Sequence, residues 1–319
     1  MVSLLDLIVY LLYKILKMNR LLVNISRAFI VLVSRFPLRV HYCWAGIWAW
    51  MMKKVFRYRY SIVHTNVARS FPDKSYGQVQ KIVDDFYKHL GEVIAETIWF
   101  AGSGYKRVRR SGIVKVTNPE VLEKYFVECP SLTVLSTHCG NWELLGGIFA
   151  YMDNTGIDYS FDKDNMRVVY KKLKSPVSNE IFKRNRINPI GKDGEKCVIE
   201  SSQILRYAVA HRKERKVYVY PTDQAPYWKA GKHFIGNFMN QPTDTMQGSV
   251  GVACRLSHGV LYVKMKRVRR GQYDLTLIPI CEDASGMTQE ELMRKYYDLL
   301  EEEIRETPAN WLWSHKRWK

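Results

Sequence analysis

The sequence predicts an α/β fold in which helices flank a central, mostly parallel mixed sheet, preceded by membrane-associated helices. Short apolar runs such as Leu132–Leu135 lead into polar turns and then into apolar residues at helical spacing. Residues 261–280 are typical of a hairpin that turns near Gly271. With 319 residues, 47% of them hydrophobic and 25% charged, the chain can bury a full core in one large domain plus an appendage.

The first 59 residues are strongly basic and rich in aromatic side chains. They contain ten lysines and arginines against one acid, Asp6, and include WAGIWAWMM at 44–52. No apolar run reaches the ~18 residues expected of a transmembrane helix; the best candidate, Val2–Leu16, is shorter and carries charges. Basic helices with Trp and Leu on the opposite face lie in the membrane interface against anionic headgroups. We therefore expect residues 1–72 to form a membrane-associating helical region and 73–319 to form the α/β domain.

Two points about this segment stay open at the level of sequence. A buried core helix with solvated charges is the alternative to membrane attachment, and the first helix could either span the bilayer or lie flat on it. No small-residue cleavage site follows the segment, so a cleaved signal peptide is not expected.

The net charge of +18 indicates an anionic partner, for which anionic lipid, an acidic carrier protein and nucleic acid are the candidates. Basic clusters at 106–110 and 264–270 could track phosphates. No RNP, KH, zinc-finger or helix-turn-helix signature accompanies them, so we expect no nucleic acid. Six cysteines without a C-x-x-C pair are typical of the reduced, mostly buried thiols of a cytosol-facing protein, with no zinc site and no disulfide.

The other elements follow from capping and strand patterns. A capping box at Ser75-x-x-Gln78 begins a helix whose apolar stripe runs to Ile94. A second box, Thr288-x-x-Glu291, begins the last long helix, which Pro308 stops. Strands are predicted at 132–135, 167–170, 216–220, 259–265 and 273–280.

His138 lies in the turn between the strand at 132–135 and a helix predicted to open at Gly140 or Asn141. Open α/β sheets place their ligand crevices at the carboxyl ends of strands. Glu143 lies early in the predicted helix, from which its carboxylate can reach back to the imidazole. It would hold one ring nitrogen protonated and leave the other free as a base. A structural hydrogen-bonding pair is the alternative reading of these two residues.

Polar residues also follow two other predicted strands. A cationic run after residue 170 would hold an anionic headgroup or a phosphopantetheine phosphate, or form a solvated face. A carboxylate and an amide follow the strand at 216–220, where either could contact substrate or support the site. The residues are Lys171, Lys172, Lys174, Lys183, Arg184 and Arg186 in the run, and Asp223 and Gln224 after the later strand.

Several chemistries are excluded by missing motifs. The chain contains no G-x-S-x-G elbow, no P-loop, no G-x-G-x-x-G and no H-E-x-x-H. Cys139 adjoins His138, but adjacent side chains at a turn diverge, so a Cys–His nucleophile is not expected. We therefore expect the imidazole to act as a general base on an incoming hydroxyl, with no covalent enzyme intermediate, no cofactor and no metal.

These residues carry a resemblance to a known family. Thr137–Glu143 resembles the G-H-x-G-N-W-E box of the late acyltransferases of lipid A biosynthesis. That family belongs to the lysophospholipid and glycerol-phosphate acyltransferase superfamily with its H-x-x-x-x-[D/E] motif. The similarity runs in order through SFP (70–72), VVYKKLKSP (168–176), FKRNR (182–186), YPTDQAP (220–226), HFIGNFMNQPT (233–243) and PANWLWSHKRWK (308–319). Lys171 and Lys172 stand where the family has Arg-Pro, and Tyr60 replaces an Arg.

The resemblance implies a glycerol-phosphate acyltransferase-like fold. It also implies transfer of a fatty acyl chain from acyl carrier protein or acyl-CoA to a hydroxyl of a lipid A precursor or related membrane lipid. The reaction is expected at the cytoplasmic face of the inner membrane, against an anionic membrane surface. His138 is assigned as the general base and Glu143 as its orienting partner, with oxyanion donors among the backbone N–H groups around Gly140–Trp142. Substrate contacts are expected from Asn141, Trp142, Lys171, Arg184, Arg186, Asp223 and Gln224.

Other functions are also compatible with the sequence. A thioesterase could use the same His138–Glu143 pair, and an acyltransferase could act on a lysophospholipid or an aminolipid instead. A membrane-binding protein without catalytic activity is the alternative that is not an enzyme.

Overall fold

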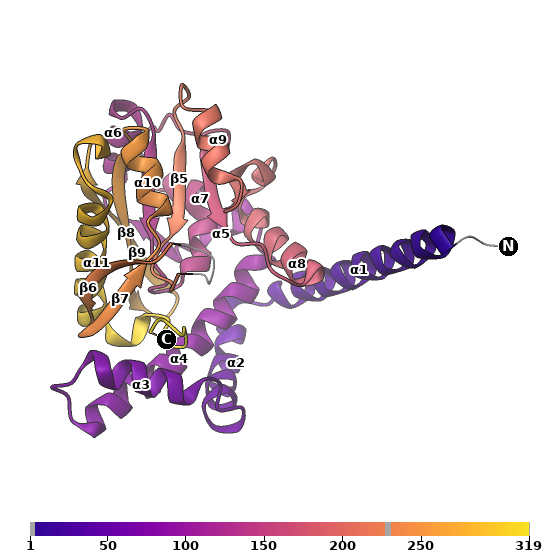
Figure 1. The fold of residues 1–319 in the computed structure, drawn as a ribbon. Helices are drawn as coiled ribbons and strands as arrows, with labels where there is room; N and C mark the ends of the chain where they lie inside the picture. The colour runs from indigo at the N-terminus through magenta and orange to yellow at the C-terminus, as the bar shows by residue number, and fades with distance from the viewer. Residues whose placement is uncertain (1–3, 227–230, 319) are drawn as a thin grey trace.

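The computed structural model describes residues 4–226 and 231–318, with side chains from Met18 onward, as an α/β fold (Figure 1). Within these residues, seven strands form one sheet in the order β1-β9-β8-β2-β5-β3-β4, and β6 and β7 form a separate hairpin. The strands are β1 (Val114–Val116), β2 (Leu132–Ser136), β3 (Met166–Tyr170), β4 (Val198–Glu200), β5 (Val217–Pro221), β6 (His233–Phe238), β7 (Gln241–Thr245), β8 (Gly259–Arg269) and β9 (Gln272–Cys281).

Five neighbouring strands of the sheet run in one direction. β8, β2, β5, β3 and β4 pair in parallel, and Leu132 at the start of β2 lies opposite both Val217 and Gly259. β9 returns antiparallel to β8 through a turn at Gly271, whose φ of +71° suits glycine, and β1 pairs in parallel with β9. The predicted mostly parallel mixed sheet and its hairpin are therefore confirmed.

Helices cover both faces of the sheet. The helices are α1 (Leu4–Ser34), α2 (Leu38–Trp50), α3 (Tyr60–Ser70), α4 (Tyr76–Ala101), α5 (Tyr105–Ser111), α6 (Pro119–Glu128), α7 (Ile148–Met152), α8 (Pro176–Ile187), α9 (Ile204–Ala210), α10 (Gly248–Arg255) and α11 (Gln289–Glu306).

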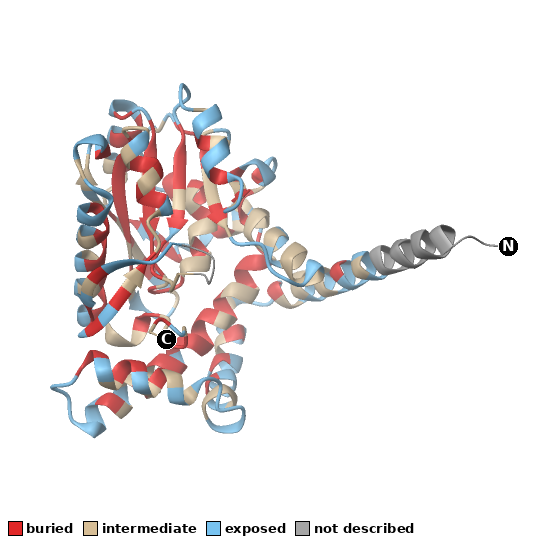
Figure 2. Ribbon diagram, in the orientation of Figure 1, coloured by how far each residue is buried: buried red, intermediate tan, exposed pale blue. Residues whose placement is uncertain are grey.

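Each face of the sheet has its own hydrophobic core. Because strand side chains alternate between faces, Leu135 of β2 packs with α9, α10 and α11, whereas Val134 packs with α5, α6 and α7. Helix α4 contributes to both cores, with Phe86 in the first and Trp99 in the second. Figure 2 shows the strands of the sheet as largely buried. The carboxyl edge of the parallel strands is thus held rigidly between two packed layers.

Most predicted elements are present, with one local difference. The capping boxes at Ser75–Gln78 and Thr288–Glu291 begin α4 and α11 as predicted. The helix expected to open at Gly140 or Asn141 is instead a 3₁₀ helix, Trp142–Gly147, followed by the short α7. Gly140 has a φ of +59°, which lies outside the helical region and delays the helix.

The N-terminal helices pack on α4 and extend away from the sheet. Helix α1 projects outward (Figure 1), and its described side chains are mostly exposed or half-buried (Figure 2). Helix α2 approaches α4 closely, because a Cβ on Gly91 would lie 2.4 Å from the carbonyl oxygen of Ala45. By length and composition no single described helix qualifies as a membrane span, whereas Met18–Ser34 and Leu38–Val55 together do, bent by 112°. The division at residue 72 stays a prediction.

Candidate active site

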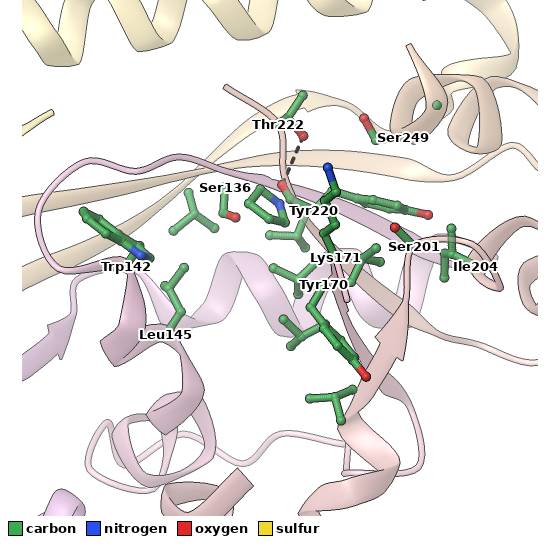
Figure 3. Close-up of a pocket in the computed structure, with 18 of the residues that line it drawn as sticks. Ser136, Trp142, Leu145, Tyr170, Lys171, Ser201, Ile204, Tyr220, Thr222 and Ser249 are labelled. Carbon is green, nitrogen blue, oxygen red and sulfur yellow. Dashed lines mark hydrogen bonds between the residues drawn. The ribbon is translucent and has the colours of Figure 1, made fainter. Parts of the chain in front are cut away.

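The carboxyl ends of the parallel strands open into a large cavity (Figure 3). β2 ends at Ser136, β3 at Tyr170, β4 at Glu200 and β5 at Pro221, and the residues that follow each strand line a cavity of about 1130 Å³. His138 is among them. The crevice predicted at this edge of the sheet is therefore present.

The imidazole of His138 is held by Asp223, which lies 85 residues later in the chain. Nδ1 of His138 lies 2.6 Å from Oδ1 of Asp223, and the His138 backbone N–H donates to Oδ2 at 3.0 Å. The indole Nε1–H of Trp311 donates to the same Oδ2 at 2.8 Å. With both of its oxygens accepting hydrogen bonds, the buried Asp223 carboxylate is fixed in orientation, and it fixes the ring in turn.

Electrostatics favour an ionised Asp223 beside His138. Burial favours the neutral acid, but the neighbouring imidazole outweighs it and lowers the pKa of Asp223 from 3.8 to about 2. Burial likewise disfavours the imidazolium, but the Asp223 carboxylate outweighs it and raises the pKa of His138 above its ordinary 6.5. The carboxylate accepts from Nδ1–H, so the lone pair of the neutral ring is placed on Nε2.

Nε2 of His138 lies on the cavity side. The side-chain amide nitrogen of Gln224 lies 3.1 Å from it and donates to its lone pair. Gln224 and Trp142 both line the cavity, and the Trp142 ring lies 5.1 Å from the His138 ring, tilted by 60°. An incoming hydroxyl that displaced the Gln224 amide would meet the basic nitrogen directly.

The prediction that Glu143 orients His138 through a hydrogen bond is wrong in this structure. The Glu143 carboxylate binds Arg186 through two parallel hydrogen bonds, of 2.9 Å to Nη2 and 3.1 Å to Nε. Burial opposes ionisation, but the guanidinium outweighs it and holds the pKa of Glu143 below 4.5. Glu143 lies on the 3₁₀ helix that begins at Trp142 and pairs with Arg186 of α8, whereas Asp223 faces Nδ1 from the loop after the neighbouring strand β5.

The predicted substrate-binding residues divide into two groups. Trp142, Lys171, Arg186 and Gln224 line the cavity, and for these four substrate contact stays a prediction. The other three, Asn141, Arg184 and Asp223, are not among its lining residues.

Each residue of the second group has a different partner. Asn141 is fully buried, and its Nδ2 donates to Glu96 of α4 at 2.8 Å. Arg184 pairs with Glu180 of the same helix at 2.7 Å. Asp223 is buried against His138. None of these three residues lines the cavity, and substrate contact by them stays a prediction.

The loop around Gly140 is tightly packed. The Gly140 N–H donates to the carbonyl of Asn310 at 3.0 Å, so the first of the expected oxyanion donors is already engaged. A Cβ at Gly140 would lie 2.5 Å from the carbonyl oxygen of Met265, which requires glycine here. Burial raises the pKa of the Cys139 thiol well above 9.0, in keeping with an inert cysteine.

Sequence reasoning missed the role of Trp311. In the structure, Trp311 of the C-terminal tail packs against Phe238 and Trp313 and donates to Asp223. No local sequence pattern predicts the contact between Trp311 and Asp223, because the two residues are 88 positions apart. Among the described residues, no cluster of His, Cys, Asp and Glu could hold a metal ion.

Comparison with known proteins adds one match. The model of the family described as bacterial lipid A biosynthesis acyltransferase matches residues 12–319. No curated protein matches the chain.

Proposed function

The chain belongs to the bacterial lipid A biosynthesis acyltransferase family and is an acyltransferase; from that premise, we propose that His138 is the general base of the transfer. The acyl chain would pass from a thioester donor to a hydroxyl of a lipid A precursor. The single observation that carries the proposal is the His138–Asp223 contact of 2.6 Å at the carboxyl edge of the sheet, with Nε2 on the cavity side.

In the proposed reaction, Nε2 of His138 takes the proton of the acceptor hydroxyl as its oxygen attacks the thioester carbonyl. The new C–O bond forms, the C–S bond breaks, and the leaving thiolate takes the proton back from the imidazolium. The products are an ester and a free thiol, with no covalent intermediate on the enzyme. A positioned base of this kind contributes about 10²–10⁴-fold to the rate.

Asp223 supports this step in two ways. Its carboxylate keeps the proton of the neutral ring on Nδ1, so Nε2 stays the base. It also stabilises the imidazolium that forms during transfer, and its support from Trp311 prevents it from turning away. Glu143 then has a different role from the one expected: it holds Arg186 at the mouth of the cavity, where the guanidinium can meet an anionic part of a substrate.

An apolar part of the cavity suits the acyl chain. It lies between the sheet and the layer of α6 and α7 and is lined by Leu122, Val134, Ile148, Val263 and Leu277. A fatty acyl chain gains free energy by leaving water for such a lining. Removing water from the reaction centre also favours transfer over hydrolysis.

We further propose that the protein works at the cytoplasmic face of the inner membrane. Exposed apolar side chains concentrate in the N-terminal helices, among them Phe29 (65% exposed), Trp44 (57%) and Trp50 (59%). Such a surface, together with the basic residues of the same segment, suits an anionic bilayer. The donor would be acyl carrier protein or acyl-CoA, and the acceptor a glycolipid presented by the membrane.

The test uses purified protein in mixed micelles with a defined acyl thioester. Thiol release and acylated product are measured with a lipid A precursor, with a lysophospholipid and with no acceptor. We expect thiol release and product in equal amounts with the lipid A precursor and little release without an acceptor. Thiol release that does not depend on an acceptor would instead identify a thioesterase, and product only with the lysophospholipid would overturn the proposed acceptor.

A further inference from the structure

The residues that line the cavity belong to the cores on both faces of the sheet, which divides it into two arms, with His138 at the carboxyl edge between them. The first is the apolar arm described above, on the side of α6 and α7. The second lies on the side of α9 and α10, where Ile204, Tyr220 and Val252 belong to the other core. Figure 3 shows Trp142 and Leu145 toward one side and Ser201, Ile204 and Ser249 toward the other, and Figure 1 shows β5 between α9 and α10. We name this second part the polar arm.

One face of α10 forms a wall of the polar arm. Gly248, Gly251, Val252 and Arg255 all line it, at the spacing of a single helical face. A Cβ on Gly248 would meet no atom within 4 Å, so the beginning of this face opens onto free space, whereas a Cβ on Gly251 would lie 3.2 Å from Oε1 of Gln289. Helix α10 ends just before the first residue of β8, which lies at the edge of the sheet opposite the catalytic edge. Gly248 therefore lies toward the catalytic edge, and Arg255 lies toward the opposite edge, about 10 Å away along the helix.

Two groups of the polar arm have no partner among the described residues. The hydroxyl of Tyr220 is buried and makes no hydrogen bond; the residue is 6% exposed and lines the cavity. Figure 3 shows its ring extending toward Ser201. Arg255 lines the cavity with an exposed guanidinium for which the described residues provide no ion pair and no hydrogen bond. A buried hydroxyl without a partner costs stability, which a bound polar ligand would recover.

The chemistry of the two arms matches the two halves of an acyl thioester. The apolar arm suits the acyl chain. The polar arm combines hydroxyl groups at Ser201, Tyr220 and Ser249 with a cation at Arg255, which suits an amide-rich linker that ends in a phosphate. A molecule lying across both arms would place its thioester at their junction, beside His138.

We propose that the polar arm binds the phosphopantetheine part of the acyl donor, with its amides along Tyr220 and its phosphate at Arg255. The inference rests on the proposed function and deepens it, because it assigns opposite faces of the sheet to the two halves of the donor. Acyl carrier protein and coenzyme A share this phosphopantetheine group, so the chemistry is common to both sources.

The test compares three donors that carry the same acyl chain: acyl carrier protein, acyl-CoA and the N-acetylcysteamine thioester, which lacks the phosphate. The variant Arg255→Gln is expected to raise the KM for the two phosphate-bearing donors about tenfold and to leave the KM for the N-acetylcysteamine thioester and for the acceptor unchanged. The control is Arg206→Gln, which removes an exposed charge from α9 outside the cavity lining. It should change none of these constants.

A second variant separates binding from folding. Tyr220→Phe removes a hydroxyl that has no partner in the free protein, so its melting temperature should be equal to or above that of the wild type. Its KM for the phosphate-bearing donors should rise several-fold. An effect of both variants on acyl carrier protein and CoA alike supports the shared linker site, and an effect on acyl carrier protein alone supports the same site and names the source.

Two results would overturn the inference. If the wild type transfers acyl groups but both variants keep every donor KM, the polar arm does not bind the donor, while the proposed function stands. If the variants raise the KM of the acceptor instead, the arm belongs to the acceptor lipid. A wild type that transfers from none of the donors removes the proposed function and this inference with it.

Discussion

Nδ1 of His138 and Oδ1 of Asp223 lie 2.6 Å apart, although the two residues come from the loops after different strands. Strands β2 and β5 pair in parallel, with Ser136 opposite Pro221, so the residues that follow them meet at one edge of the sheet. The Glu143 carboxylate, only five positions from His138 in the sequence, is instead engaged by Arg186. The orientation of the imidazole therefore depends on the register of the sheet.

Replacing the partner of the imidazole should disable it. Asp223→Asn presents an amide that can donate to Nδ1, which moves the ring proton to Nε2 and removes the base. We expect kcat for acyl transfer to fall about 10²–10⁴-fold, with the secondary structure unchanged. Steady-state kinetics and circular dichroism check this. Asp298→Asn on α11 is the control, and an equal loss of activity in both variants would contradict the assignment.

The effects of replacing Glu143 and Arg186 on the free energy of unfolding should be strongly non-additive. Arg186→Met leaves a largely buried carboxylate without its partner, so it should lower the free energy of unfolding by about 1–3 kcal/mol. The partial exposure of Arg186, whose side chain is 37% exposed, keeps the effect in this range. The double variant Arg186→Met/Glu143→Gln should recover much of the loss in denaturant unfolding.

An exposed pair gives the matched comparison for that cycle. Arg305 binds Glu301 across one turn of α11, and Arg305→Gln should cost less than about 0.5 kcal/mol. If Arg186→Met costs no more than Arg305→Gln, the Glu143–Arg186 pair does not organise the mouth of the cavity.

The pH dependence should follow the His138–Asp223 pair. The pKa of His138 is raised above 6.5, mainly by Asp223 acting against burial, so kcat/KM should increase with pH and level off above that raised pKa. The charged pair stabilises the fold fully below 6.5, and this stability is lost as pH rises through the folded pKa of His138. At the acid end it is lost as pH falls from 3.8 toward about 2, where Asp223 takes up a proton.

A comparison of variants isolates this titration. The difference in unfolding free energy between the wild type and Asp223→Asn should be larger just below pH 6.5 than at alkaline pH. The acid limb of kcat/KM should reach its midpoint above 6.5 in the wild type. A midpoint below 6.5 would show that another group controls the rate.

The aromatic residues of the N-terminal helices should carry membrane binding. Trp44 and Trp50 are 57% and 59% exposed, and burying a large apolar side chain contributes about 1.5–3 kcal/mol. The double variant Trp44→Ser/Trp50→Ser should therefore bind anionic vesicles at least about tenfold more weakly in sedimentation, and wild-type binding should weaken as salt increases. Tyr76→Ser, 73% exposed at the start of α4, is the control. Equal binding by both variants would contradict membrane attachment through this segment.

Sequence patterns predict those features that depend on neighbouring residues. The capping boxes of α4 and α11, the hairpin β8–β9 and the position of His138 after β2 all follow from local spacing. The partners at the site cannot be predicted in this way, because Asp223 reaches His138 only through the order of the strands. Trp311 reaches Asp223 only through the path of the C-terminal tail. Local spacing predicts Glu143 as the partner of the His138 imidazole, because Glu143 is near His138 in the sequence.

The most direct measurement is the rate of acyl transfer by His138→Ala, assayed by mass spectrometry of the product with purified protein, an acyl thioester and a lipid A precursor. The initial rate should fall about 10²–10⁴-fold at every pH. The melting temperature and vesicle binding should stay close to those of the wild type. A variant that folds, binds vesicles and transfers the acyl chain at a near wild-type rate would contradict the assignment of His138 as the base.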